Sequence, residues 1–216
     1  EFRRSALEVL RQPLEDGQVT LTRASMTLTY PSRIMLVGAM NPCPCGYYSH
    51  PEKTCTCRED QIARYISRIS GPLLDRIDLH IEMTPVKFHE LQDRRRGESS
   101  SRIRARVESA REQQRLRFSE ISKTGATETA PRTYCNSQMS SAHIRRFCRL
   151  DADCCRLMEH AMKRLGLTAR AYDRILKVSR TIADLDHAEQ IQSVHIAEAI
   201  QYRALDRSHW TPAYAC

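Results

Sequence analysis

Asn41 is the first of three polar side chains whose type and position suit contact with a triphosphate. It follows a continuous apolar run at residues 33–38, which is typical of a buried parallel strand. An amide at the carboxyl end of such a strand can orient a water molecule against a terminal phosphate. The alternative is that Asn41 only satisfies a turn before Pro42.

Arg76 is the second such residue, and it lies between Asp75 and Asp78 after a Gly-Pro break. A guanidinium fork can stabilise charge on a transferring phosphoryl group, including one held by a neighbouring subunit. The alternative is a surface salt bridge with either aspartate.

Arg170 is the third, in the first turn of a helix predicted at 169–186. The helix dipole favours anions there and disfavours a cation, so an arginine at this point indicates a phosphate partner. Arg174 lies one turn later on the same side and is a second candidate for binding nucleotide. The alternative is a pairing of Arg170 with Asp173 or another acid.

A cysteine cluster supplies a different chemistry. Four of the nine cysteines fall in one short window, at Cys43, Cys45, Cys55 and Cys57. Four thiolates suit tetrahedral Zn²⁺ in a closed structural site, and His50 could replace one of them. The alternative is that these are reduced free thiols.

Arg23 ends the first half of a predicted β-hairpin, in which apolar residues alternate with threonine over 19–23 and 26–30. Such a hairpin could project into a central pore and bring Arg23 to a polymer. The alternative is an ordinary hairpin packed on the core.

The composition favours an acidic partner. Net charge is +8 with a pI near 9.2, which fits either nucleic-acid contact or solvated arginine-rich helices. An odd number of cysteines and no secretory signal predict a reduced, cytoplasmic location. No apolar run reaches the length of a membrane span, so we expect no membrane partner.

The periodicity divides the chain near residue 84. Before it we expect helices at 2–15 and 59–70 and a short strand at 77–83; after it the pattern is entirely helical. The later helices are expected at 86–93, 100–119, 138–148, 151–165, 169–186 and 193–204. Ser193 is the expected cap of the last one, and Ile103, Val107, Ala110 and Gln114 form the expected inner stripe of the long helix at 100–119.

No Gly-x-x-x-x-Gly-Lys-Ser/Thr loop occurs, and no apolar strand ends in Asp-Glu. The motifs nevertheless resemble the AAA+ ATPases of the magnesium-chelatase-like family, in particular its YifB/ComM group. The resemblance starts with Val-Gly-Ala-Met-Asn-Pro-Cys-Pro-Cys-Gly at 37–46. It continues at 62–65, 69–79, 166–176, 181–185 and 197–203.

The resemblance implies a role for each candidate: Asn41 as sensor 1, Arg76 as arginine finger and Arg170 as sensor 2. It implies an α/β fold at 1–84, the C-terminal half of an AAA+ core with a β-hairpin and a cysteine-rich insertion. An all-α helical lid would follow at 85–207, with a flexible tail at 208–216.

The resemblance also implies a function. The full-length protein would use ATP and Mg²⁺, form a hexameric ring, and act as a ComM-like DNA helicase in branch migration during natural transformation. Because the phosphate loop is missing, we expect this chain alone to be inactive. One alternative is a magnesium-chelatase-type subunit that remodels a protein partner. Another is a non-enzymatic, zinc-stabilised DNA-binding module.

Overall fold

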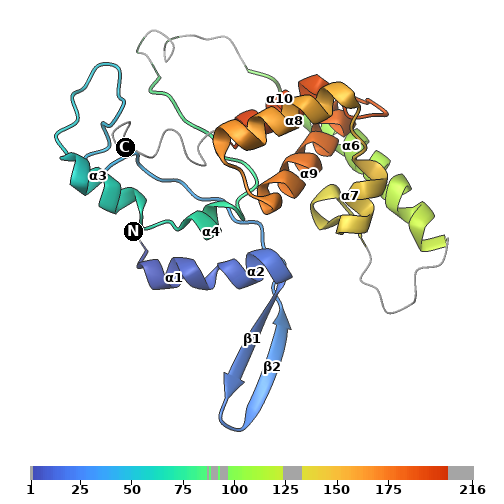
Figure 1. Ribbon diagram of the computed structural model, residues 1–216, viewed down its shortest axis with the longest axis horizontal. Helices are drawn as coiled ribbons and strands as arrows, with labels where there is room; N and C mark the ends of the chain where they lie inside the picture. The colour runs from blue at the N-terminus through green and yellow to red at the C-terminus, as the bar shows by residue number, and fades with distance from the viewer. Residues whose placement is uncertain (1, 87, 89–91, 93–96, 124–132, 204–216) are drawn as a thin grey trace. The chain divides into compact units, whose positions relative to one another are not determined.

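The computed structural model describes residues 2–86, 88, 92, 97–123 and 133–203 (Figure 1). The chain forms two compact units, Glu1–His80 and Ile81–Arg203. The division predicted after residue 84, with core and lid on its two sides, stays a prediction. Among the described helices, none has both the length and the apolar character that crossing a membrane requires.

The first unit begins with two short helices, α1 (Arg4–Val9) and α2 (Arg11–Asp16), where the sequence predicts one. The interruption lies at Leu10, one turn before Pro13. Proline has no N–H to donate to the carbonyl four residues earlier, and its ring crowds that carbonyl. The helix therefore breaks in the turn that precedes the proline.

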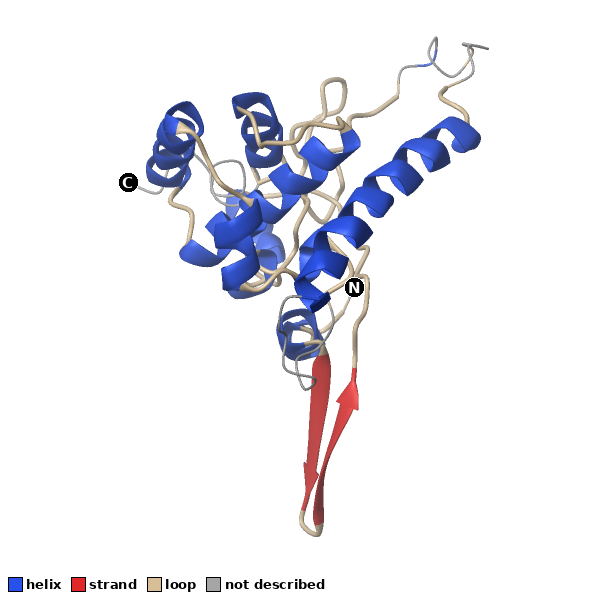
Figure 2. Cartoon of the chain, turned by 90° about the vertical axis from the view of Figure 1, so that its right-hand side faces the viewer, coloured by secondary structure: helices blue, strands red, loops and turns tan. Residues whose placement is uncertain are grey.

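A β-hairpin follows, formed by β1 (Gln18–Arg23) and β2 (Met26–Pro31), as predicted. The strands are antiparallel, and Arg23 lies opposite Met26 beside the turn. The hairpin extends from the end of α2 as a two-stranded ribbon (Figures 1 and 2). Leu21 and Leu28 are exposed, so the hairpin is not packed on a core.

The strands predicted at 33–38 and 77–83 are wrong, because neither segment pairs with another strand among the described residues. The two-stranded β1–β2 sheet is the one sheet of the described residues. A strand needs a neighbouring backbone to accept and donate its hydrogen bonds, and neither segment has one in the described chain. Apolar side chains along them are consequently open to solvent: Met35 is 89% exposed and Met83 is 84% exposed.

The rest of the first unit is the cysteine-bearing loop, α3 (Glu59–Ile66) and α4 (Gly71–Leu74). α3 falls within the helix predicted at 59–70, and its Ile62 is buried. α4 begins at Ser70, whose hydroxyl accepts a hydrogen bond from the Leu73 N–H at 3.3 Å. Pro72 in its first turn is already set to the helical φ.

The second unit is helical, as the sequence predicts. Its elements are α6 (Ser100–Lys123), the 3₁₀ turn η1 (Asn136–Gln138), α7 (Ser141–Phe147), α8 (Ala152–Leu165), α9 (Ala169–Leu185) and α10 (Ser193–Gln201). The helix predicted at 86–93 falls mostly outside the described residues, and the tail predicted at 208–216 falls wholly outside them.

α9 lies at the centre of this unit and buries Ile175, Leu176 and Ala183. The residues packed around them come from α6, α7, α8 and α10, and include Phe118, Ile144, Met158 and Ile196.

The stripe predicted on α6 is only half correct. Ile103 and Val107 are 41% and 42% exposed, whereas Ala110 and Gln114 are buried. Among the side chains of α6 that the structure describes, the inward face therefore begins at Ala110 and continues to Phe118.

Ser193 is not the cap of α10. It is the first residue of the helix, and Gln192 precedes it in the capping position. There the backbone N–H of Gln192 donates to Nδ1 of the buried His195 at 3.0 Å. A ring nitrogen, rather than the serine hydroxyl, therefore accepts a backbone hydrogen bond at the start of α10.

Candidate functional site

Asn41 lies at the end of the extended segment that follows the hairpin, and it is exposed. The chain then folds back in a turn, in which the Gly46 N–H donates to the Cys43 carbonyl at 3.0 Å. Gly46 has a φ of +82°, and a Cβ built on it would lie 4.0 Å from both Cγ and Nδ2 of Asn41, an ordinary van der Waals separation. The Asn41 side chain thus lies near the first turn of the cysteine loop, with room between them.

Arg76 follows α4 and is held within its own unit. One Nη donates to the Pro72 carbonyl at 2.6 Å, and the other forms an ion pair with Glu15 of α2. The acid is therefore Glu15, rather than the Asp75 or Asp78 of the alternative interpretation. Only 11% of the Arg76 side chain is exposed, so presenting its charge to an external phosphate would require exchanging the Glu15 contact.

Arg76 also forms one wall of an open hollow on the first unit. The other lining residues, all from α1 and α2, are Glu8, Val9, Arg11, Gln12, Glu15 and Asp16. The pKa of Glu8 lies below its usual range, because the Ser70 side chain and then Arg11 donate hydrogen bonds to the carboxylate.

Arg170 and Arg174 lie in the first two turns of α9, in the other unit. The helix begins at Thr168, whose hydroxyl accepts a hydrogen bond from the Ala171 N–H at 3.2 Å. Arg170 is exposed and Arg174 is half-buried. Asn41 and Arg76 thus share one unit and Arg170 belongs to the other; the nucleotide-contacting roles of all four residues stay predictions.

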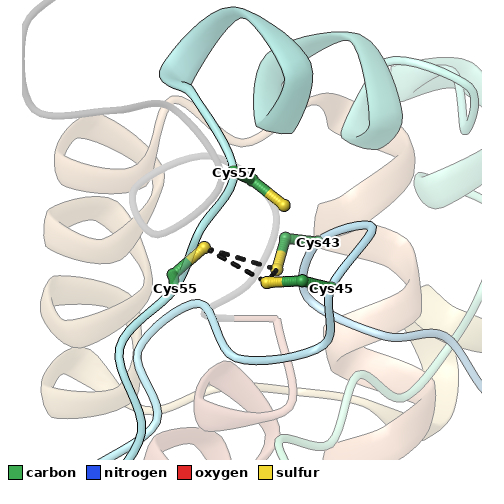
Figure 3. Close-up of side chains that lie close together, drawn as sticks. All are labelled: Cys43, Cys45, Cys55 and Cys57. Carbon is green, nitrogen blue, oxygen red and sulfur yellow. Dashed lines mark hydrogen bonds between the residues drawn. The ribbon is translucent and has the colours of Figure 1, made fainter.

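The four cysteines of the loop do come together. Their sulfurs lie within 4.8 Å of one another, and three pairs are closer: Cys43–Cys45 at 3.3 Å, Cys45–Cys55 at 3.5 Å and Cys43–Cys55 at 3.7 Å. Figure 3 shows the side chains of Cys43 and Cys45 turned toward those of Cys55 and Cys57. Cys43 is fully buried, and all four are free thiols.

His50 is not part of this group, contrary to the possibility raised by the sequence. Its Nδ1 accepts hydrogen bonds from the backbone N–H groups of Glu52 and Lys53, at 3.0 and 3.1 Å. The imidazole therefore closes the tip of the loop.

The protonation of the cluster is uneven. Hydrogen bonds from the backbone N–H groups of Tyr47 and Thr56 lower the pKa of Cys45 to about 5. The N–H of Cys57 acts in the same direction on Cys55, but desolvation and the neighbouring sulfurs outweigh it and raise the pKa of Cys55 to about 12. Desolvation also raises the pKa of Cys57. A cation bound among the four sulfurs would favour the thiolate form of each, so metal binding would release protons.

A buried polar network in the second unit is the feature that sequence reasoning missed. Asp184 is fully buried and accepts a bidentate ion pair from Arg117 of α6, with one N–O distance of 2.8 Å. It also accepts from Nε of Arg180 at 3.0 Å and from Nδ2 of Asn136 at 2.8 Å. Arg117 donates in turn to the Asn136 side-chain oxygen at 3.0 Å.

Arg180 extends the network to the turn after α9. Its two Nη atoms donate to the carbonyls of Ala188 at 2.6 Å and Glu189 at 2.9 Å. Burial lowers the pKa of its guanidinium, while Asp184 acts to raise it. The network therefore joins α6, η1, α9 and the start of the segment leading to α10 through one carboxylate.

Comparison with known proteins agrees with the motifs. Residues 1–91 match the family described as magnesium chelatase, subunit ChlI, and residues 97–203 match the C-terminal family of the same subunit. The competence protein ComM of Haemophilus influenzae is 42% identical over 208 residues, and YifB of Salmonella typhimurium is 40% identical over 208 residues. The protein Rv2897c of Mycobacterium tuberculosis is 34% identical over 204 residues.

The matches cover 94–96% of this chain and 38% of each of those relatives, so the chain spans well under half of their length. The two adjoining family models together, and each of these relatives, cover almost the whole chain. The chain belongs to the magnesium-chelatase-like YifB/ComM family, as the motifs indicate.

Proposed function

We propose that the chain is part of an AAA+ ATPase that moves DNA, with the β1–β2 hairpin as its DNA-contacting element. The observation that carries the proposal is the hairpin itself. Its apolar residues Leu21, Met26 and Leu28 are 43–55% exposed, and Arg23 lies exposed beside its turn. A ribbon whose apolar side chains are this exposed and that carries a cation near its tip is suited to reach a phosphate backbone.

The motor is completed by the residues predicted to surround ATP and Mg²⁺ in the full-length protein, which we propose to be a cytoplasmic hexamer. Asn41 positions the attacking water, Arg76 acts on the nucleotide of a neighbouring subunit, and Arg170, with Arg174 beside it, couples nucleotide state to the helical unit. The name of the Haemophilus relative, a competence protein, supports DNA as the substrate and natural transformation as the setting.

DNA contact is tested on this chain by fluorescence anisotropy with labelled duplex and forked DNA over a range of salt concentrations. Arg23→Ala should weaken binding to all sequences alike and reduce the slope of log K against log salt by about 1. Arg68→Ala, which removes another exposed arginine of the same unit, is the control. An unchanged slope with Arg23→Ala rejects the hairpin as the DNA contact.

ATP hydrolysis is tested on the full-length protein with and without DNA. Loss of a finger arginine costs about 10³–10⁵ in kcat, so Arg76→Ala should abolish turnover while oligomers still form. Stimulation by DNA separates a DNA motor from a chelatase-type subunit, whose ATPase would respond to a protein partner instead. DNA binding by a full-length protein without any ATPase activity would favour the non-enzymatic module.

The cysteine cluster is the place in this proposal for a structural Zn²⁺. With four sulfur ligands it has no open position for substrate, so the metal would stabilise the loop rather than take part in hydrolysis.

A further inference from the structure

We infer that Cys43, Cys45, Cys55 and Cys57 bind one Zn²⁺, and that this metal centre fixes the turn against which Asn41 lies. The inference has two parts, a metal site and its mechanical link to Asn41. The second part gains its functional meaning from the proposed role of Asn41 in ATP hydrolysis.

The spacing of the sulfurs selects a metal over a disulfide. In a tetrahedral site with Zn–S bonds of about 2.3 Å, neighbouring sulfurs lie about 3.8 Å apart. The three closest pairs here are separated by 3.3, 3.5 and 3.7 Å. A disulfide would bring two sulfurs to about 2.05 Å and leave the other two unrelated, whereas here all four converge.

The backbone around the sulfurs supports the same conclusion. The Tyr48 N–H points at the Cys43 sulfur, with an N–S distance of 3.3 Å. Hydrogen bonds of this kind orient thiolate ligands and spread their negative charge. Cys43 is also fully buried, as expected for a ligand in a closed site.

The link to Asn41 is short and stiff. Asn41 is separated from the ligand Cys43 only by Pro42, whose φ is fixed by its ring. The turn that starts at Cys43 then brings the backbone of Gly46 near the Asn41 side chain. A Cβ built on Gly46 would lie 4.0 Å from Cγ of Asn41. Two ligands, Cys43 and Cys45, belong to this turn, so holding their sulfurs on one ion also holds the wall beside Asn41.

We therefore expect that loss of the metal alone changes the position of the Asn41 side chain, whether or not a nucleotide is bound. An exposed loop of this length has little apolar packing, apart from Cys43, to keep its shape. Four metal–sulfur bonds replace that missing core.

The metal site is tested by elemental analysis of the purified chain. We expect one zinc per chain, and Co²⁺ exchanged into the site should give the intense visible absorption of a tetrahedral cobalt thiolate. Cys45→Ser should lose the metal, whereas Cys155→Ser, which removes an exposed cysteine of α8, should keep it. A chain that carries no metal, carries iron in place of zinc, or links these cysteines as disulfides overturns the assignment.

The link to Asn41 is tested by NMR, for which the sequence is well suited. The chain has two asparagines, Asn41 and Asn136, so ¹⁵N-asparagine labelling gives two side-chain amide signals. Asn136 is buried in the polar network of the other unit and serves as the reference. Chelation of zinc should shift or broaden the Asn41 amide and leave the Asn136 amide in place.

If the metal-free chain unfolds, the zinc form can be compared with a paramagnetic Co²⁺ form instead, because both metal forms are folded. The Asn41 amide should then move strongly between the two metal forms of the folded chain. An Asn41 amide that is the same with zinc, with cobalt and after chelation overturns the link. Neither measurement uses nucleotide or DNA, so its failure leaves the motor proposal standing, and failure of the ATPase tests leaves the metal site standing.

Discussion

Replacing Asp184 by asparagine should destabilise the second unit more than almost any other isosteric change. Asp184 is fully buried and accepts four hydrogen bonds, three from the guanidinium groups of Arg117 and Arg180 and one from Asn136. In Asp184→Asn the shape is kept but the charge is lost. The new amide N–H₂ would also face the guanidinium groups of Arg117 and Arg180, which only donate.

The size of the effect follows from what is left behind. Removing one partner of a buried ion pair typically costs about 3–5 kcal/mol, because the other charge stays buried without compensation. Arg180 has only 3% of its side chain exposed and cannot reach water, whereas Arg117 has 14% exposed and can turn partly outward. We therefore expect a loss near the lower limit, about 3 kcal/mol.

Urea unfolding of the chain, followed by far-UV circular dichroism, measures this loss. With slopes of about 1–3 kcal/mol/M, the midpoint of the helical unit should fall by about 1–3 M. Glu159→Gln is the matched control: it also turns a carboxylate into an amide, but in an exposed pair with Lys163, and should leave the urea midpoint nearly unchanged. A cost for Asp184→Asn below about 1 kcal/mol would refute the reasoning, because the network would then contribute no more than a surface pair.

Three further predictions concern the same unit. Gly166 ends α8 at a φ of +59°, so Gly166→Ala should lower the free energy of unfolding by about 1–2 kcal/mol. Urea titration measures the loss, and an unchanged stability would contradict the left-handed cap. Cys155 is exposed and should react with iodoacetamide at pH 8 well before Cys154, which is buried and whose pKa burial raises to about 11; mass spectrometry of tryptic peptides checks the order. Burial likewise raises the pKa of Cys148 to about 11, so the folded state keeps a proton that the unfolded state releases. The free energy of unfolding should therefore fall between pH 9 and pH 11, and it should fall less steeply in Cys148→Ala. Equal slopes in the two proteins would reject the linkage.

The sequence predicts the helices of the second unit well because each depends on local signals. The limits of α8 and α9 follow from Asp151, Gly166 and Thr168, residues that cap helices by their own side chain or by a left-handed backbone. The same local signals misled at Pro13, where the break appears one turn earlier than the proline that causes it. They failed for residues 33–38, because a strand depends on a partner that its own pattern does not contain.

In the candidate site too, the features formed by residues close in sequence could be predicted and those formed by distant residues could not. The cysteine cluster could be predicted, since all four sulfurs come from one short loop and their chemistry is unambiguous. The partner of Arg76 could not, because Glu15 lies 61 positions earlier, while two nearer acids were equally plausible by charge. The Asp184 network was missed for a similar reason: Arg117 and Asn136 lie 67 and 48 positions away, and a charged residue late in a helix usually faces solvent.

The position of Asp184 on α9 connects the buried network to the predicted nucleotide contact. α9 is a single helix that carries Arg170 in its first turn and Arg180 and Asp184 in its last two turns. Ten residues of helix separate the two arginines, about 15 Å along one axis. Ala171 in the first turn is buried, and the network binds the last turns to α6. A helix packed along its length moves as part of its unit, because a packed core does not deform continuously. If Arg170 senses the nucleotide, the response therefore involves the whole helical unit rather than a swing of one side chain.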